Sequence, residues 1–293
     1  MNNITSIIIP DSVTEIDDEA FFGCMGLTSV TIPNIEVAED NTAYASVDSV
    51  LFNTCAAQSA SKDKTVLIKY PEDKQGAYCI PAGVTSIGEF AVIECAGLTS
   101  VTFPDSMVAI GDHAFGGCIG LTAVTIPASV TKIGYLTFDG CTRLASIAVH
   151  PDNPAYRSDN GVLFNRDMTE LILYPQGRQG DYAVPDSVIE IHTRAFAGCT
   201  GLTSVILPDS LQVIGFCAFG GCTGLTSIAL PDSVTKIRSF AFSRCTGLTS
   251  MVIPRSVKKI EKKAFVDCHN LTAITVHPDN PVYTSENGKL AEK

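Results

Sequence analysis

Hydrophobic and polar residues alternate in a phrase that returns every 23 residues along much of this chain. The phrase begins at Leu98, Leu121, Leu202, Leu225 and Leu248, and its typical form is Leu-Thr-Ser-Val-Thr-Ile-Pro. The apolar residues fall at positions one, four and six, and Val and Ile alternate with Thr, which is typical of a half-buried β-strand. Proline ends each strand because it has no N–H to donate to a ladder. The pattern predicts one short strand in each repeat.

The remainder of each repeat predicts turns and a second strand. Pro-Asp-Ser, as at 208–210, is a turn signature, and Val-x-x-Ile, as at 234–237, predicts another short strand. Ala-Phe-x-Gly-Cys is too short for a regular helix, so we expect a helical turn with Phe pointing inward. A fixed period of this length indicates a solenoid, in which each coil is buried by its neighbours. We therefore predict an α/β, β-rich, right-handed solenoid of ~23-residue coils with a parallel β-ladder, running over 1–293 as a single domain.

Three longer units interrupt the period. Those at about 38–80 and 149–184 each contain two apolar runs around an Asn/Asp-rich turn, which predicts an inserted β-hairpin. A third copy, at about 276–293, begins with the same His-Pro-Asp-Asn-Pro motif at His277 and stops soon after Gly288. We interpret it as a truncated version of the same unit.

Equivalent residues of stacked coils are expected to form columns through the core, because neighbouring strands lie about 4.8 Å apart. One predicted column is aromatic and contains Phe21, Phe115, Phe138, Phe196, Phe219, Phe242 and Phe265. Eight of the eleven cysteines share a second position, namely Cys24, Cys95, Cys118, Cys141, Cys199, Cys222, Cys245 and Cys268. Parallel side chains in such a column lie too far apart at Cβ for disulfides and cannot surround zinc tetrahedrally. We predict buried, reduced cysteines that act as small hydrophobic residues, which suits a reducing or anaerobic setting.

Charge is distributed unevenly. The net charge is −11, which argues against nucleic-acid binding, but 236–263 contains eight basic residues and one acidic residue. Asp11, Glu15, Asp18 and Glu19 of the first repeat occupy the positions of Arg255, Lys259, Lys262 and Lys263. With Lys258, these basic residues are candidates for binding an acidic partner such as an anionic glycan, or for weak head-to-tail self-association. The alternative is that the charges serve solubility and protect the end of the stack.

Aromatic residues vary at the two positions before Ala-Phe. If exposed, Phe90, Tyr135, Phe216 and Phe240 would form a partial aromatic stripe on one edge, suited to a binding partner. The alternative is that they pack over the turns.

The sequence contains no constellation that predicts catalysis. Aspartates recur at one position, but each follows Pro and precedes Ser, which is a turn signature. The five histidines share no spacing with a nucleophile or a metal partner. We therefore expect no enzyme, no cofactor and no metal site, and the absence of a long apolar run predicts no membrane insertion.

The full phrase, Leu-Thr-Ser-Val-Thr-Ile-Pro-Asp-Ser-Val-Thr-x-Ile-Gly-x-x-Ala-Phe-x-Gly-Cys, resembles the BspA-like, or Treponema-type, leucine-rich repeats. The resemblance covers essentially the whole chain. It implies a secreted or surface-exposed protein of bacteria or some parasitic protists, often one that adheres to host proteins or other cells. It implies no shared catalytic residues.

The resulting hypothesis is a non-enzymatic recognition or adhesion protein that presents an extended repeat surface to a protein or anionic glycan on another cell or matrix. An extracellular or cell-surface location follows from the resemblance, although no export signal is visible. Two alternatives remain. The chain could be a structural scaffold module of a larger surface protein, or a polysaccharide-active β-solenoid enzyme, which would need charged side chains clustered on adjacent strand faces.

Overall fold

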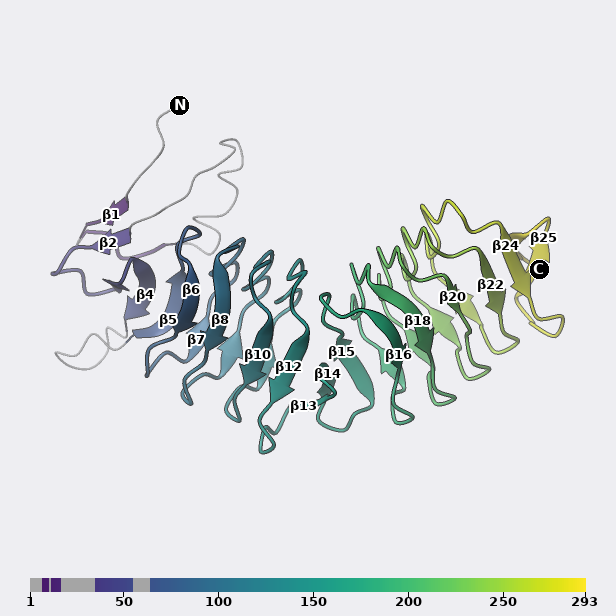
Figure 1. Ribbon diagram of the computed structural model, residues 1–293, viewed down its shortest axis with the longest axis horizontal. Helices are drawn as coiled ribbons and strands as arrows, with labels where there is room; N and C mark the ends of the chain where they lie inside the picture. Colours follow the sequence, from purple (N-terminus) through teal and green to yellow (C-terminus); the bar gives the residue numbers. More distant parts are fainter. Residues whose placement is uncertain (1–6, 11, 17–34, 55–63) are drawn as a thin grey trace, which may run out of the picture. The chain divides into compact units, whose positions relative to one another are not determined.

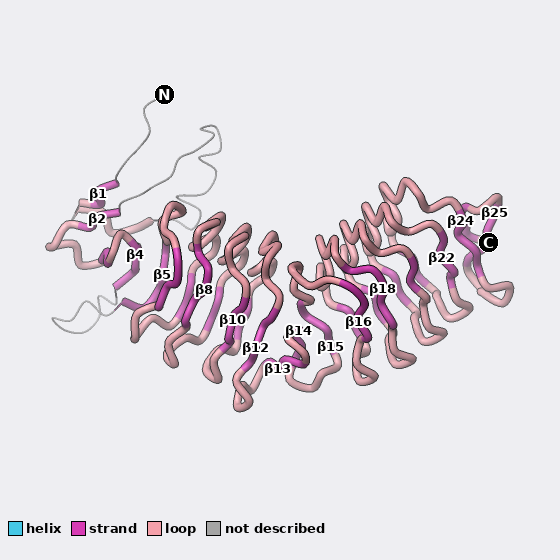
Figure 2. Tube along the Cα trace, viewed as in Figure 1, coloured by secondary structure: helices cyan, strands magenta, loops and turns pink. Residues whose placement is uncertain are grey.

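A computed structural model describes residues 7–10, 12–16, 35–54 and 64–293 of the 293-residue chain. Strands β1 to β26 are joined by turns, and no helix occurs within these ranges (Figure 2). The described residues accordingly include no helix long and apolar enough to cross a membrane. The chain divides into two compact units, unit 1 with residues 1–144 and 149–155, and unit 2 with residues 145–148 and 156–293.

Unit 1 contains short ladders of parallel strands (Figure 1). Its largest sheet has the order β11 (Lys132–Ile133), β9 (Ala109–Ile110), β7 (Ser86–Ile87), β5 (Lys64–Lys69), β4 (Val50–Thr54) and β3 (Tyr44–Val47). The remaining strands are β1 (Ile7–Ile9), which pairs with β2 (Ile35–Val37), β6 (Gly76–Cys79), which pairs with β8 (Leu98–Thr102), and β10 (Ala123–Ile126).

Unit 2 repeats this arrangement. Its largest sheet has the order β13 (Tyr156–Asp159), β14 (Val162–Asn165), β15 (Glu170–Leu173), β17 (Glu190–Ile191), β19 (Val213–Ile214), β21 (Lys236–Ile237) and β23 (Lys259–Ile260). A second ladder contains β16 (Gly180–Ala183), β18 (Leu202–Ile206) and β20 (Ser227–Ile228), and a third pairs β22 (Ser250–Ile253) with β24 (Ala273–Val276). The hairpin β25 (Tyr283–Glu286) and β26 (Lys289–Glu292) follows, and β12 (Ser146–Val149) spans the boundary between the two units.

The register of these ladders confirms the predicted solenoid. Val205 pairs with Ile228 and Ile214 with Ile237, so residues one repeat apart lie side by side. The second strand of each coil is shorter than predicted. In the coil that begins at Leu225 it covers Lys236–Ile237, and the buried Val234 lies before it.

The segment predicted to be a helical turn forms a different structure. Alternate N–H groups donate within the coil, as from Gly220 to Cys217 O at 3.0 Å, while those between them donate to the next coil, as from Phe219 to Ala241 O at 2.7 Å. A helix would satisfy all these donors internally. Here the turn segments become a further ladder of hydrogen bonds between coils, and the helical-turn prediction was wrong.

The cores consist of stacked like side chains. Phe196, Phe219, Phe242 and Phe265 of unit 2 stack with ring centroids 4.8, 5.3 and 5.6 Å apart and interplanar angles of 12° or less. In unit 1, Phe115 and Phe138 stack at 5.5 Å. Tyr174 extends the column of unit 2, with its ring 4.9 Å from that of Phe196, which the repeat pattern did not indicate. Phe21 and Cys24 lie outside the described residues.

The cysteine column is buried and also polar in its contacts. Cys95, Cys118, Cys141, Cys199, Cys222 and Cys245 have no exposed surface, Cys268 is half-buried, and none of the described cysteines is in a disulfide. Thiols of the column donate to main-chain carbonyls of the preceding coil, as from Cys222 to Phe196 O at 3.0 Å and from Cys245 to Phe219 O at 2.9 Å. Cys222 and Cys245 therefore do more than fill space, because each of these two bonds connects two coils.

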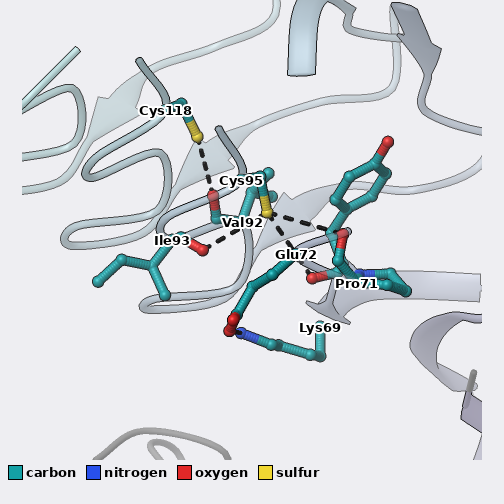
Figure 3. A network of polar contacts seen from close by, with 8 residues as sticks. Lys69, Pro71, Glu72, Val92, Ile93, Cys95 and Cys118 are labelled. Carbon is teal, nitrogen blue, oxygen red and sulfur yellow. Dashed lines mark hydrogen bonds and ion pairs between the residues drawn. The ribbon is translucent and has the colours of Figure 1, made fainter. Parts of the chain in front are cut away.

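Figure 3 shows the start of this column in unit 1. Cys118 donates to Val92 O at 2.9 Å, and Cys95 lies 3.4 Å from Ile93 O. The buried Lys69 ammonium pairs with Glu72 at 3.0 Å beside them. A charge this deeply buried needs such a partner, because an unpaired ammonium would be costly to remove from water.

Buried asparagines attach the hairpin units to the coil before them. Asn280 has no exposed surface, and its amide nitrogen donates to Pro254 O at 2.8 Å and Val257 O at 3.0 Å. Its side-chain oxygen accepts from the N–H groups of Val282 and Tyr283. Asn41 and Asn153 bond the corresponding turns in the same way. The third, shorter copy therefore forms a complete hairpin.

Candidate recognition surface

The last full coil of unit 2 presents a group of exposed lysines. Four residues, hereafter the lysine cluster, are exposed: Lys258 directly before strand β23, Lys259 on it, and Lys262 and Lys263 in the turn segment that follows. This coil has lysines where the preceding coil has Thr235, Lys236, Ser239 and Phe240, and it keeps the inward Val257 and Ala264. The fold thus places four positive charges within six residues of one coil.

Acidic neighbours neutralise little of this charge. Among the described residues, the cluster has one ion pair, from Lys259 Nζ to Glu261 Oε1 at 3.9 Å. Glu261 is already engaged, since it accepts from Ser239 N at 3.0 Å and Ser239 Oγ at 3.1 Å and pairs with Lys236 at 3.4 Å. The Ser239 backbone N–H is the main group that lowers the pKa of Glu261, with the Ser239 hydroxyl and Lys236 acting in the same direction. Glu261 therefore remains a stable anion that organises two coils.

Arg255 differs from the other basic candidates. Its guanidinium lies 3.3 Å from the carboxylate of Asp232, one coil earlier, and both side chains are largely exposed. An exposed pair of this kind contributes little to stability, but it reduces the positive charge that a partner would meet. We therefore keep Arg255 outside the lysine cluster.

The four aromatic candidates are divided between the two units, with Phe90 and Tyr135 in unit 1 and Phe216 and Phe240 in unit 2. In unit 2, Phe216 is exposed and meets the half-buried Phe240 with ring centroids 5.6 Å apart, and Lys263 Nζ lies 5.7 Å from the centre of the Phe240 ring. In unit 1, Phe90 stacks on His113 at 4.9 Å, while Tyr135 is 42% exposed. The Phe216–Phe240 pair is thus the aromatic group that adjoins the lysine cluster.

Exposed apolar side chains occur at one repeat position in the second and third ladders of unit 2. Ala183 pairs with Ile206 and Val252 with Thr275, at the fifth position of successive repeats. Ile206 and Val252 are 67% and 57% exposed. They stand where other repeats have Thr, as at Thr102, Thr125 and Thr275.

The other polar candidates lie in turns. Asp209 is exposed in a Pro-Asp-Ser turn, and Ser210 Oγ donates to Val188 O of the preceding coil at 2.6 Å. His150 and His277 each accept a hydrogen bond from the N–H two residues later, at 3.2 Å. No group of three metal-ligating side chains occurs in the described ranges. Asp11, Asp18 and Glu19, the proposed acidic counterparts of the lysines, lie outside those ranges, and Glu15 is exposed.

The coils are parallel and stacked, the equivalent apolar residues of the repeats are buried, and the charged residues lie at outward positions. This is the architecture of a leucine-rich repeat solenoid. The family model described as the BspA type leucine-rich repeat region matches the chain in six copies, over residues 1–66, 75–173 and 179–285. The chain belongs to this family.

Solved structures of bacterial repeat proteins are similar to this one. A leucine-rich cell surface protein from Faecalibacterium prausnitzii is 28% identical, with a TM-score of 0.66 over 93% of this chain and 79% of that chain. A leucine-rich repeat protein from Eubacterium ventriosum is 26% identical, with a TM-score of 0.53 over 97% of this chain and 63% of that one. The pneumococcal vaccine antigen PcpA is 24% identical and shares the fold, with a TM-score of 0.71. The similar region covers 94% of this chain and 62% of PcpA. A comparison with curated proteins gave no match.

Proposed function

We propose that this protein is a non-enzymatic recognition or adhesion protein of the bacterial cell surface, and that the lysine cluster is where it contacts an acidic macromolecule on another cell or matrix. The observation that carries the proposal is the presence of four exposed lysines in one coil, where the nearest carboxylate, Glu261, is already held by Ser239 and Lys236. Uncompensated charge of one sign steers association with a partner of the opposite sign.

Family membership supports the wider part of the proposal. The chain is a BspA-type repeat protein, and a similar solved structure belongs to a cell surface protein. A solenoid offers a long surface without a deep catalytic cleft, which suits binding to macromolecules. The surface location and the adhesive role of this chain are inferred from these likenesses.

A binding screen with two charge-matched variants tests the proposal. Wild-type protein is applied to a glycan array and to immobilised extracellular-matrix proteins, beside a variant with Lys258, Lys259, Lys262 and Lys263 changed to Glu. The matched control reverses four exposed basic residues elsewhere, Lys132, Arg143, Arg157 and Lys289. We expect the first variant to lose binding and the control to retain it. Equal binding by the two variants would reject the lysine cluster, and no binding by the wild type would favour a passive scaffold.

A further inference from the structure

Two neighbouring columns of side chains run along the turn segments of unit 2. The first contains Thr193, Phe216, Ser239 and Lys262, and the second contains Arg194, Cys217, Phe240 and Lys263. Main-chain hydrogen bonds keep successive coils in register, as from Cys217 N to Ser239 O at 3.0 Å. All four residues of the second column have left-handed backbone, with φ between 52° and 61°. Their side chains therefore leave successive coils in the same direction, and the two columns place aromatic rings between basic residues.

Phe216 and Phe240, hereafter the aromatic platform, form a pair that crosses from one column to the other. Their ring centroids are 5.6 Å apart and the rings are inclined at 63°. Phe216 is 38% exposed, whereas Phe240 is half-buried and supports it from the next coil. The surface of unit 2 thus has an apolar area whose position is fixed by packing between two coils.

Basic groups adjoin the aromatic platform. Lys263 Nζ lies 5.7 Å from the centre of the Phe240 ring, a distance at which the ring quadrupole attracts a cation. Lys262 precedes it in the first column and is exposed. Tyr135 and Phe216 hold the same repeat position as Lys262 in other coils and are also exposed. Exposure is therefore a property of this repeat position, and unit 2 uses it for a ring in one coil and for an ammonium group two coils later.

The main chain beside the aromatic platform is already engaged. Phe216 O accepts from Arg194 N at 2.9 Å. Ser239 N donates to the Glu261 carboxylate at 3.0 Å, and Ser239 O accepts from Cys217 N. An extended peptide that adds to a sheet needs free main-chain groups with which to pair. A ligand at the platform is therefore recognised by side chains, namely aromatic rings and ammonium groups.

We propose that the aromatic platform and the adjoining lysines bind an acidic polysaccharide, which runs along the stack of coils. A sugar ring has an apolar face of C–H groups, and this face packs against the negative face of an aromatic ring without needing a pocket. Phe216 binds one sugar in this way, and Lys262 and Lys263 bind the carboxylate of a nearby sugar by charge-assisted hydrogen bonds. Successive coils lie about 4.8 Å apart, so both contacts fall along one sugar chain. This inference rests on the proposed function and narrows its acidic partner to a glycan.

Fluorescence anisotropy with three labelled polymers of equal length tests the inference. Oligogalacturonate carries a carboxylate on each sugar, a dextran oligosaccharide carries none, and an oligoglutamate peptide carries the same charge without sugar rings. We expect wild type to prefer oligogalacturonate to both of the others. Phe216→Ala should weaken oligogalacturonate binding about tenfold and leave oligoglutamate binding unchanged. Ile206→Ala removes an exposed apolar side chain from another ladder of the same coil, so it serves as the control and should change neither affinity.

Phe216→Trp gives a direct reading of the contact. The chain contains no tryptophan, so the indole introduced here is the only one in the protein. Because the substitution keeps an aromatic face, we expect affinity for oligogalacturonate close to that of wild type and a change in tryptophan emission on binding. Emission that oligogalacturonate leaves unchanged, or a loss of affinity as large as that of Phe216→Ala, would overturn the inference.

The variant with the reversed lysine cluster separates this inference from the proposed function. If it loses both acidic polymers while Phe216→Ala binds them like wild type, the lysines act without the aromatic platform, and only the inference is rejected. If Phe216→Ala loses oligogalacturonate while the reversed variant binds it like wild type, both the lysine cluster and the inference are rejected. Equal weakening of oligogalacturonate and oligoglutamate by Phe216→Ala would indicate a peptide partner and would also reject the inference.

Discussion

Left-handed backbone conformation recurs at two positions of each described turn segment, and the second of them lies directly before the cysteine. Glycine occupies it in four coils, with φ of +71° at Gly117 and +75° at Gly221, but Arg244 adopts φ of +56° at the same position. A residue with a Cβ atom is strained by about 1–2 kcal/mol in this region. The repeat therefore favours glycine here for its backbone freedom, and the charged exceptions store some strain.

Substitution of Gly221 by alanine tests this explanation. A Cβ atom at Gly221 would come no closer than 3.7 Å to Gly198, so steric clash is not expected to contribute. Backbone strain, partly offset by the lower entropy of the unfolded chain, should reduce the free energy of unfolding by about 1 kcal/mol. Urea denaturation measures the change. Arg244→Gly should change stability by less than about 0.5 kcal/mol, because released strain and added chain entropy oppose each other. A Gly221→Ala protein as stable as wild type would contradict the account.

Buried thiols make stability depend on alkaline pH. Burial raises the pKa of Cys222 to about 12 and that of Cys141 well above its ordinary value. The unfolded chain ionises its thiols near the ordinary pKa of about 8.5. Below about pH 8.5, the buried thiol of Cys222 makes its full contribution to the free energy of unfolding. As the pH rises from there towards 12, this contribution falls by about 1.4 kcal/mol per pH unit.

Urea midpoints at pH 8 and pH 10 test this linkage. Wild type should lose more stability between the two pH values than Cys222→Ala, because the variant has no thiol to ionise at this site when it unfolds. At pH 8 the variant should be the less stable of the two, since Phe196 O loses its thiol donor and the core loses volume. Equal losses in the two proteins between pH 8 and pH 10 would show that the thiol does not carry this dependence.

At the scale of the element, the buried Asn280 holds the third hairpin unit against the coil before it. Asn280→Ala removes a donor from Pro254 O and Val257 O and an acceptor from two N–H groups. Pro254 O keeps the Val257 N–H, but Val257 O and the N–H groups of Val282 and Tyr283 lose this partner, so unfolding should become easier by about 2–4 kcal/mol. Amide exchange over 282–292 should rise in the same variant. His277→Ala, which removes an exposed ring two positions from the turn, serves as the control and should cost less than about 1 kcal/mol. Similar stabilities for the two variants would contradict this role.

The strands could be predicted from the sequence because the pleat imposes a period of two that the apolar residues follow. The turn segment could not, because its hydrogen bonds go to another coil, and no local pattern distinguishes Phe219 N bonded to Ala241 O from an ordinary helical turn. Asn280 was overlooked for a related reason. An asparagine between Asp and Pro is typical of a turn, and its burial depends on a carbonyl 26 residues earlier.

Parts of the candidate site were visible in the sequence and parts were not. The lysines could be named from their charge, but the pairing of Arg255 with Asp232 required coordinates.

At the scale of the whole molecule, the chain forms two solenoid units. Each builds its core from columns of like residues, so outward positions can change without disturbing the interior. This freedom explains how one coil can carry four lysines in a protein with a net charge of −11. We expect partner binding to depend on the residues of individual coils. That the chain forms one uninterrupted domain stays a prediction.

We propose above that the lysine cluster recognises an acidic partner. The most direct test is the affinity for immobilised poly-L-glutamate, measured by biolayer interferometry, of wild type and the two charge-matched variants described above. The account predicts that reversal of Lys258, Lys259, Lys262 and Lys263 weakens binding by about tenfold or more relative to the control variant, and that added salt reduces this difference. Equal affinities for the two variants at low salt would contradict it.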